Sequence, residues 1–331
     1  MTQTKMQALY LESFDVKAFT PVMLDVPSPA PGEVLVKIHA SGVNPIDYKI
    51  RSGRAPYAMP ELPAVLGTDM AGEVVSVGDG VHDFKPGDAV YGLTGGVRGL
   101  QGSLAEYAAV DARLIAHQPS NLDMRESAAL PLVFLTAWEG LVDYAGVKSA
   151  DKVLVQGGAG GVGHMAIQLA KALGAEVYAT CSAKDIPLVE SMGATAIDYR
   201  SATTQEIMEK YTGGQGFDVI YDTVGGPVLQ SSLSAVRYYG HIASCAAFSE
   251  INLADSSLRC VTVSGVFVLL PMLTGVNRSH HGEVLQELTR LAEEGKIKPV
   301  LDPRRFSLNT ALDAHDAVEN GADIKVVIDI I

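Results

Sequence analysis

The chain has 331 residues, of which 47% are apolar and 19% charged, so it is long enough for one or two globular domains with a large core. Its formal net charge of −13 at pH 7 disfavours binding to nucleic acid or to an anionic membrane surface. Three widely spaced cysteines argue against a disulfide framework, and no apolar run is long enough for a signal peptide or a membrane span. We therefore expect a cytoplasmic protein.

Residues 1–120 contain short segments in which apolar and polar side chains alternate, as they do in half-buried strands. Gly, Pro or Asp residues bound each segment, which favours turns between them. The segments are EVLVKIHA (33–40), EVVSVG (73–78), DAVYG (88–92) and LAEYAAV (104–110). This part of the chain predicts a mainly β barrel or sandwich. Helical spacing follows in PLVFLTAWEGLVDYAG (131–146).

From residue 152 onward, strand-like and helix-like segments alternate, which predicts a doubly wound parallel sheet with helices on both faces. An amphipathic helix (280–297) and a last strand (324–330) follow. The strand-like segments of the alternating part are KVLVQ (152–156), EVYAT (176–180), TAIDY (195–199), FDVIYD (217–222), YGHIASC (239–245) and VTVSGVF (261–267).

The segment after residue 156 carries Gly158, Gly160 and Gly163 in a G-x-G-x-x-G pattern, between a predicted strand and a predicted helix. Such glycines allow a tight turn, close approach of a pyrophosphate to the backbone, and close packing of helix on strand. The N–H groups at the helix N-terminus then favour an anion. The pattern predicts a dinucleotide-binding loop, and the alternative is a glycine-rich turn without a ligand.

The turn after the next strand reads CSAKD (181–185) and lies about 20 residues past the last glycine, where the ribose of a dinucleotide is recognised. A carboxylate there binds two ribose hydroxyls, whereas Ser182 and Lys184 favour the 2′-phosphate of NADPH. Two alternatives remain open. Ser182 and Asp185 could form a helix capping box beside a solvated Lys184, and Asp185 could bind ribose hydroxyls.

These motifs, in this order, resemble the zinc-independent quinone oxidoreductases of the medium-chain dehydrogenase/reductase superfamily. The resemblance extends over nearly the whole chain. The segments that carry it are ASGVNPIDYKIRSG (40–53), LGTDMAGEVVSVGDGVHDFKPGDAVYG (66–92), LPLVFLTAWEGL (130–141), GGAGGVG (157–163), DTVGG (222–226) and IKVVI (324–328).

The resemblance implies a GroES-like catalytic domain (1–122 and 300–331) and a Rossmann cofactor domain (123–299), with NADPH in the cleft between them. It also implies a homodimer or homotetramer. The activity implied is hydride transfer to a quinone or to an α,β-unsaturated ketone or aldehyde.

The resemblance assigns candidate catalytic roles to Asn44, Asp47, Tyr48 and Lys49. The cofactor contacts that it implies are Asn44, Thr136, Gly158, Gly160, Gly161, Val162, Gly163, Ser182, Lys184, Tyr199, Cys245, Phe267 and Lys325. Each polar candidate has an ordinary structural alternative. Asn44 could cap a short helix, Asp47 could pair with Lys49 or Arg51, and Thr136 could bond a helical carbonyl.

Two positions depart from the usual pattern of the family. Lys49 stands where many relatives have Tyr, which weakens the inference that a quinone itself is the substrate; Lys49 could donate a hydrogen bond to a substrate carbonyl or to Asp47. Ile324 stands where the family commonly has Gly.

No metal is expected. Zinc-dependent relatives carry Cys and His where this chain has Asn44 and Thr68, and residues 93–103 contain neither Cys nor His. The three cysteines are expected to be core residues. Two alternatives to the reductase remain: a non-catalytic NADPH-binding protein, either a redox sensor or a structural protein, and a zinc alcohol dehydrogenase, which the missing ligands disfavour.

Overall fold

The computed structural model describes residues 4–14, 18–322 and 324–331. The chain forms two compact units, Met1–Leu132 with Leu269–Ile331 (unit 1) and Val133–Val268 (unit 2). Helix α3 (Pro131–Trp138) begins in unit 1 and continues into unit 2. No helix in the described part of the chain is both long enough and apolar enough to cross a bilayer.

Unit 1 is mainly β. One sheet has the order β15-β16-β3-β5-β6-β8, with β7 also paired to β3, and a smaller sheet has the order β2-β1-β4. The strands are β1 (Lys5–Leu11), β2 (Thr20–Asp25), β3 (Glu33–Val43), β4 (Ala64–Val65), β5 (Asp69–Val77), β6 (Ala89–Leu93), β7 (Tyr107–Asp111), β8 (Ile115–His117), β15 (Phe306–Ser307) and β16 (Val326–Asp329). The helices are α1 (Pro45–Arg51), η1 (Ala112–Leu114), α2 (Met124–Ala128), α9 (Leu270–Thr274), α10 (Arg278–Glu293), η4 (Leu308–Thr310) and α11 (Ala311–Glu319).

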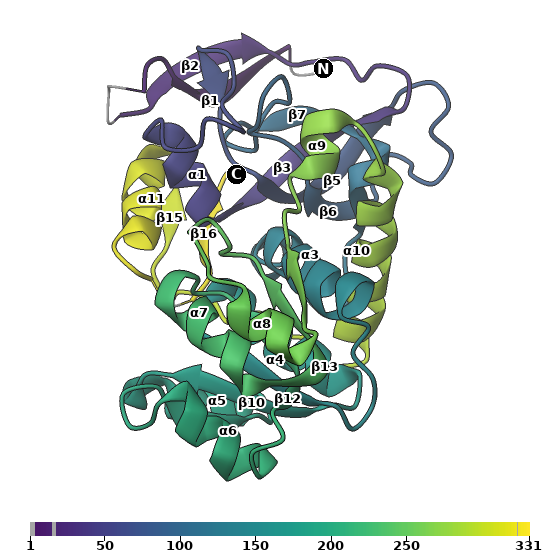
Figure 1. Ribbon diagram of the computed structural model, residues 1–331. Helices are drawn as coiled ribbons and strands as arrows, with labels where there is room; N and C mark the ends of the chain where they lie inside the picture. The colour runs from purple at the N-terminus through teal and green to yellow at the C-terminus, as the bar shows by residue number, and fades with distance from the viewer. Residues whose placement is uncertain (1–3, 15–17, 323) are drawn as a thin grey trace. The chain divides into compact units, whose positions relative to one another are not determined.

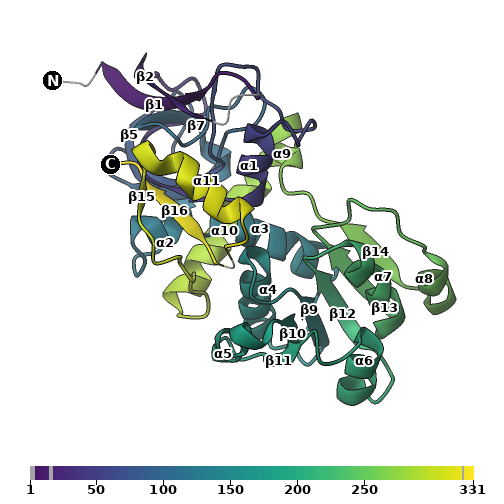
Figure 2. The same ribbon diagram turned by 90° about the vertical axis from the view of Figure 1, so that its left-hand side faces the viewer.

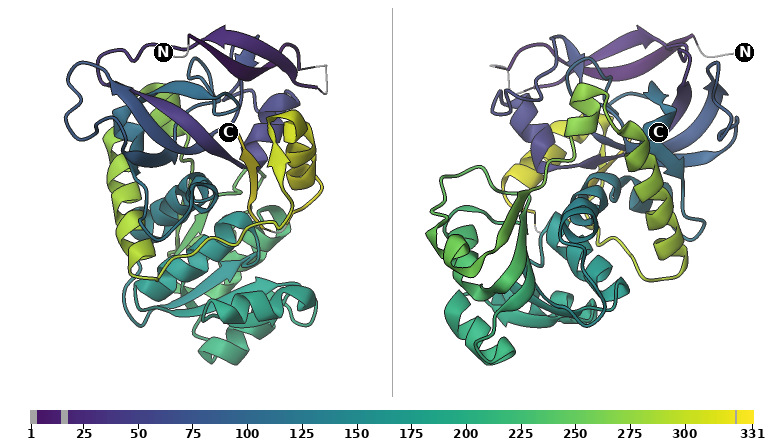
Figure 3. Two further views of the ribbon diagram at one scale, coloured as in Figure 1. Left: turned by 180° about the vertical axis from the view of Figure 1, so that it is seen from behind. Right: turned by 45° about the vertical axis from the view of Figure 1, so that its right-hand side comes forward.

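The two ends of the chain meet within unit 1. The last strand, β16, pairs antiparallel with β3, so that Val326 lies opposite Val43. In the left view of Figure 3 this C-terminal strand, in yellow, runs beside the purple β3 (see also Figure 1). The pairing brings Lys325 next to the start of α1, although 281 residues of chain separate it from Asn44.

Unit 2 contains a six-stranded sheet with the order β11-β10-β9-β12-β13-β14, in which every pairing is parallel. Its strands are β9 (Lys152–Gln156), β10 (Glu176–Cys181), β11 (Thr195–Asp198), β12 (Phe217–Asp222), β13 (Val236–Ser244) and β14 (Thr262–Gly265). Its helices are η2 (Glu139–Tyr144), α4 (Gly161–Ala172), η3 (Ala183–Asp185), α5 (Ile186–Ser191), α6 (Thr204–Thr212), α7 (Gly226–Ala235) and α8 (Ala254–Arg259).

The strand order of unit 2 reverses direction between β9 and β12. The chain moves outward one way through α4 to β10, and the other way from β12 through α7 to β13. Because such crossovers are right-handed, α4 and α7 cover opposite faces of the sheet, as Figure 2 shows. Ligands of doubly wound sheets bind at the carboxyl ends of the strands near this reversal.

The predicted fold class is confirmed, but the compact units differ from the expected domain bounds: residues 123–132 lie in unit 1, and so does the stretch 269–299. This stretch contains α10, and its packing lies in unit 1: the Tyr91 hydroxyl on β6 donates to the Leu285 carbonyl at 2.8 Å. Leu285 and Leu288 are fully buried on this side of the helix. The apolar face of α10 therefore belongs to the core of unit 1.

Candidate active site and cofactor-binding loops

The predicted cofactor-binding residues of unit 2 follow the carboxyl ends of its strands. Because all six strands are parallel, these ends share one edge of the sheet. The glycine loop follows β9, Ser182 and Lys184 follow β10, and Tyr199 follows β11. Cys245 follows β13, and Phe267 lies two residues past β14. The sheet thus gathers loops that are more than a hundred residues apart in sequence, from Gly158 to Phe267.

The glycine loop is shaped by contacts within the chain at three positions. The left-handed conformation falls on Gly157 (φ +79°), not on Gly158, so the tight turn comes one residue earlier than the pattern suggests. A Cβ on Gly158 would lie 2.7 Å from the Ala179 Cβ, and a Cβ on Gly163 would lie 2.0 Å from the Gly157 carbonyl oxygen. These two glycines are required for close packing of the loop and α4 on the sheet.

Gly160 differs from its neighbours, because no contact within the described part of the chain requires glycine there. Its backbone (φ −75°, ψ 171°) suits any residue, and a Cβ would meet only the Gly157 oxygen, at 3.5 Å. Gly160 is the N-cap of α4, where the first helical N–H groups have no acceptor within the helix. The open side of Gly160 therefore fits the close approach of an anionic ligand such as a dinucleotide diphosphate.

Thr180 anchors this loop from the neighbouring strand, a contact that the sequence pattern does not reveal. The Thr180 hydroxyl accepts from the Gly157 N–H at 3.1 Å, and its carbonyl accepts from the Gly158 N–H at 2.7 Å. The hydroxyl in turn donates to the buried Gln156 side chain at 2.8 Å, and Gln156 donates to Ser232 at 3.2 Å. A buried network therefore fixes where the glycine loop begins.

The turn after β10 contains Ser182 and Asp185, for which the sequence left open whether they bond to each other or bind a ligand. The Ser182 hydroxyl donates to the Asp185 carboxylate at 2.5 Å, within a short 3-10 helix (η3), and Lys184 is exposed. The Ser182 hydroxyl is therefore engaged with an acidic side chain. The role of these residues in binding a cofactor stays a prediction.

Tyr199 is about half exposed, and its backbone N–H donates to the Cys181 carbonyl at 3.1 Å, which fastens the end of β11 beside the turn after β10. The following residue, Arg200, was not predicted as a site residue. Its guanidinium carbon lies 4.8 Å from the centre of the Tyr199 ring. The Tyr-Arg dipeptide directly after a strand is the only sequence signal for this pair.

Asp222, the first residue of the DTVGG segment (222–226), is fully buried and organises the loop after β12. Its carboxylate accepts from the N–H groups of Val224 and Gly225 and from the Ser244 hydroxyl, at 2.6 to 3.2 Å. Two further predicted residues of unit 2, Thr136 and Cys245, bond to residues of β12. The Thr136 carbonyl accepts from the buried Tyr221 hydroxyl at 2.6 Å, and Cys245 donates its N–H to the Asp222 carbonyl at 3.1 Å.

In unit 1, the predicted residues Asn44, Asp47 and Lys325 join Thr68 and Asp69 in one buried network. The Asn44 amide donates to the Thr68 hydroxyl at 3.2 Å and to the Asp69 carboxylate at 2.8 Å. The Lys325 ammonium donates to the Asn44 amide oxygen and lies 3.8 Å from Asp69. Asn44 begins α1, as its structural alternative required, but its side chain points into this network.

Asp47 completes the network through one of its two carboxylate oxygens. Its Oδ2 accepts from the Asn44 N–H at 2.7 Å and from the Thr68 hydroxyl at 3.3 Å, while its buried Oδ1 has no hydrogen-bond partner among the described residues. Burial raises the pKa of Asp47 to about 7 and the pKa of Asp69 to about 6. Burial also lowers the pKa of the Lys325 ammonium, which Asp69 opposes.

The expected alternative pairing of Asp47 with Lys49 or Arg51 does not form. Arg51 instead binds Asp316 at 2.7 Å and Glu319 at 3.0 Å, both on α11. The half-buried Lys49 ammonium makes no hydrogen bond or ion pair with any residue that the structure describes. Tyr48 is also half-buried, and Arg54 lies 5.4 Å from the centre of its ring.

No group of three or more His, Cys, Asp and Glu side chains within residues 4–14, 18–322 and 324–331 is arranged to hold a metal ion. Asn44 and Thr68 lie side by side, and their polar atoms bond one another. None of the three cysteines forms a disulfide: Cys181 is buried, Cys245 is partly buried, and Cys260 is exposed. The expectation that all three are core residues is therefore wrong for Cys260.

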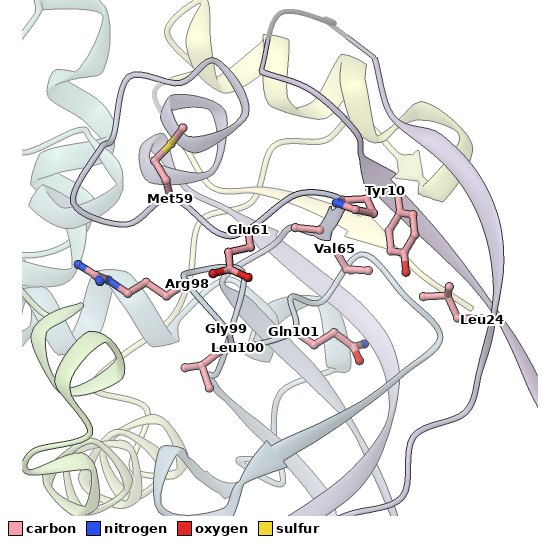
Figure 4. Close-up of a pocket in the computed structure, with 11 residues that line it drawn as sticks. Tyr10, Leu24, Met59, Glu61, Val65, Arg98, Gly99, Leu100 and Gln101 are labelled. Carbon is pink, nitrogen blue, oxygen red and sulfur yellow. The ribbon is translucent and has the colours of Figure 1, made fainter.

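A hollow of about 520 Å³ lies elsewhere in unit 1 and contains none of the predicted site residues. Figure 4 shows Tyr10 and Leu24, from β1 and β2, on one side of it and Met59 and Arg98 on the other. Glu61 lies between them. This hollow is separate from the Asn44 network.

Comparisons with known proteins place the chain in a family. Residues 30–120 match the alcohol dehydrogenase GroES-like domain, and residues 161–290 match the family described as zinc-binding dehydrogenase. The chain is 39% identical to a 2-methylene-furan-3-one reductase of Solanum lycopersicum over 92% of its own length and 73% of that protein. It is 36% identical to an NADPH-dependent alkenal/one oxidoreductase of Arabidopsis thaliana, with the same coverage, and 32% identical to the quinone-oxidoreductase QR1 of Triphysaria versicolor, over 93% of both chains.

The chain belongs to the quinone oxidoreductase family of the medium-chain dehydrogenase/reductase superfamily. Among solved structures, an alcohol dehydrogenase superfamily protein from Novosphingobium aromaticivorans shares 50% identity, with a TM-score of 0.95 over 98% of this chain and 100% of that one. Membership of this quinone oxidoreductase family confirms the resemblance inferred from the motifs, together with the GroES-like and Rossmann components of the fold.

Proposed function

We propose that this chain is an NADPH-dependent reductase that transfers hydride to a conjugated carbonyl compound, with α,β-unsaturated ketones and aldehydes as the first class and quinones as the second. The observation that carries the proposal is the open side of Gly160 at the N-terminus of α4, which fits the close approach of a diphosphate. The names of the relatives support both substrate classes, and the more similar relatives are named for enone or alkenal chemistry.

The residues of unit 2 would hold the cofactor. The N–H groups at the start of α4 would bind the diphosphate beside Gly160, and Lys184 would bind the 2′-phosphate. NADPH supplies the hydride when it is bound. Thr136, Cys245 and Phe267 remain proposed contacts of the same cofactor.

The residues of unit 1 would prepare the carbonyl substrate. Negative charge builds up on the carbonyl oxygen as the conjugated system accepts a hydride, and a fixed donor stabilises that charge. Lys49 suits this role because its ammonium has no partner among the described residues. The Asn44 network would fix the start of α1, and thus the position of Lys49.

We also propose that the reaction needs no zinc. The Asn44 side chain donates its amide hydrogens to Thr68 and Asp69, and its oxygen accepts from Lys325, so its polar atoms are engaged. Chelation of divalent metal should therefore leave turnover unchanged, and metal analysis should find zinc well below one equivalent. Stoichiometric zinc would favour an alcohol dehydrogenase.

The test is turnover of a substrate panel. Purified protein is incubated with NADPH and a matched series of enones, enals and quinones, and both NADPH oxidation and the reduced product are measured. Lys49→Met should lower kcat/KM for enones by roughly ten- to a hundredfold and leave the Kd for NADPH within twofold. Cofactor binding without turnover on any substrate would contradict the reductase and favour a sensor or structural protein.

The proposed assembly is a homodimer joined through unit 2. Strand β14 ends the sheet and pairs only with β13 among the described strands. Phe248, Leu253 and Leu258 are between 52% and 80% exposed near this edge. An unpaired edge with apolar side chains beside it favours association of two copies.

A further inference from the structure

Arg200 lies where β11 ends, next to the turn that contains Ser182. Cys181 and Asp198 lie side by side in the sheet, and the Tyr199 N–H donates to the Cys181 carbonyl. The Arg200 N–H donates to the Asp198 carboxylate at 3.1 Å, so the backbone at residue 200 is held against the end of the strand. The residues that follow β10 and those that follow β11 therefore lie next to one another.

The Arg200 guanidinium is exposed and makes no ion pair with any residue of the described chain. Its recorded partner is the ring of Tyr199, 4.8 Å from the guanidinium carbon. Other arginines of unit 2 have further partners. Arg237 binds Asp218, and Arg259 donates to the Val236 carbonyl. The Tyr199 ring thus restrains a cation whose charge is not neutralised by the protein.

Charge balance at the turn calls for such a cation. A 2′-phosphate carries between one and two negative charges near neutral pH. Lys184 supplies one positive charge, but the Asp185 carboxylate one residue later offsets it, and the Ser182 hydroxyl already donates to Asp185. The turn itself therefore carries no net positive charge, and its Ser182 hydroxyl is already bonded to the carboxylate.

We propose that Arg200 is a second phosphate-reading residue, whose guanidinium binds the 2′-phosphate of NADPH while the Tyr199 ring holds it in position. This inference rests on the proposed cofactor. Arginine suits the role because its planar fork binds phosphate oxygens in pairs and stacks on an aromatic ring at the same time. Arg200 therefore determines specificity for NADPH over NADH and has no part in the hydride step.

The experiment compares Kd values for NADPH and NADH, measured by fluorescence titration, in the wild type, Arg200→Gln and Arg200→Lys. Arg200→Gln should raise the Kd for NADPH roughly ten- to thirtyfold and leave the Kd for NADH within twofold of the wild-type value, because only NADPH carries the extra phosphate. Arg200→Lys keeps the charge and should recover part of the loss.

Lys210→Gln is the matched control. It removes the same charge from above a tyrosine ring, since the Lys210 ammonium lies 4.7 Å from the centre of the Tyr211 ring. The Tyr211 carbonyl accepts from the Lys152 ammonium at the start of β9. This pair therefore lies toward the amino ends of the strands, away from the predicted cofactor-binding loops at their carboxyl ends. Lys210→Gln should leave both Kd values within twofold.

The outcomes separate the inference from the function on which it rests. A wild type that prefers NADPH, together with an unchanged preference in Arg200→Gln, overturns the role of Arg200 alone. Equal losses in Arg200→Gln and Lys210→Gln overturn it as well, because they show a general effect of charge. A wild type without a preference for NADPH overturns the proposed cofactor and the inference together.

Discussion

At the residue scale, Asp47 is a carboxyl group that is almost completely removed from water. It lies on α1 and faces Asn44, Thr68, Asp69 and Lys325, and its Oδ1 is buried without a hydrogen-bond partner among the described residues. An ionised carboxylate is costly in such a place, whereas a protonated one is not. Burial accordingly raises its pKa to about 7.

The stability of the protein should therefore depend on the protonation of Asp47. The folded pKa lies above the ordinary value of 3.8, so the folded state holds the proton more tightly. This contribution is fully present below about pH 4 and is lost as the pH rises through 7. Asp69 acts in the same direction, since burial raises its pKa to about 6.

We expect Asp47→Asn to flatten this pH dependence. Between pH 5 and 7, the free energy of unfolding of the wild type should fall by up to about 1 kcal/mol per pH unit more than that of the variant. Melting temperatures measured across this range test the expectation. Asp255→Asn, which changes an exposed carboxylate, is the control. Equal slopes in the wild type and in Asp47→Asn would mean that Asp47 is ionised in the folded protein throughout.

The sequence predicts some residues of the candidate site but not others. Gly160, Ser182 and Lys184 follow from spacing, because a strand, a tight turn and a helix fix the distance between the diphosphate and the ribose. Thr180 and Arg200 do not follow from spacing. Thr180 bonds to the loop that follows the neighbouring strand β9, and Arg200 is brought beside the turn after β10 by the register of β10 and β11.

At the scale of elements, the start of α4 separates two uses of glycine. Gly163 is needed for contact between the helix and the loop before it, since a Cβ there would overlap the Gly157 oxygen. Gly160 has room for a Cβ within the chain. The two positions are three residues apart on one helix end, yet we expect their substitution to affect different properties.

Gly163→Ala should lower the free energy of unfolding by about 1–3 kcal/mol, because α4 must move away from β9. Gly160→Ala should change the free energy of unfolding by less than about 0.5 kcal/mol. It should raise the Kd for both NADPH and NADH about tenfold or more, because the added methyl group occupies the space proposed for the diphosphate. Thermal melting and cofactor titration of the two variants give the answer. Unchanged cofactor affinity in Gly160→Ala would show that the diphosphate binds elsewhere.

The sequence pattern predicts the existence of the elements better than their ends. β3 continues to Val43 and β5 begins at Asp69, beyond the expected 33–40 and 73–78, because β16 and β6 extend the pairing at these ends. The helix expected over 131–146 changes from α to π geometry after Trp138. Gly140 packs there against Tyr221, and this contact comes from a strand far along the chain.

At the scale of the whole molecule, the chain leaves unit 1 after Leu132 and returns to it at Leu269. The alternation of strands and helices predicts unit 2, and the resemblance of the motifs predicts that both termini share unit 1. The place of α10 could not be predicted. Its apolar stripe shows that one face is buried, but it does not show that Tyr91 and β8 cover it.

Association through unit 2 can be tested at its edge. Leu258→Asp, at a side chain that is 80% exposed on α8, should convert the proposed dimer into a monomer, because a charge in a paired interface loses its hydration. Val276→Asp places the same charge at a side chain of unit 1 that is 70% exposed and should leave the mass unchanged. Light scattering coupled to size-exclusion chromatography measures both. A wild type that is already monomeric would contradict the dimer.

The position of Thr180 has a consequence for protein engineering. It secures Gly157 and Gly158 from inside β10, and the turn that is predicted to bind the ribose begins only at Ser182. The two recognition tasks are thus attached to the same strand but anchored by different residues. A turn grafted at residues 182–185 from a coenzyme-binding domain of opposite preference, together with a substitution of Arg200, should therefore shift the enzyme from NADPH toward NADH without disturbing the hydrogen bonds that fix the glycine loop.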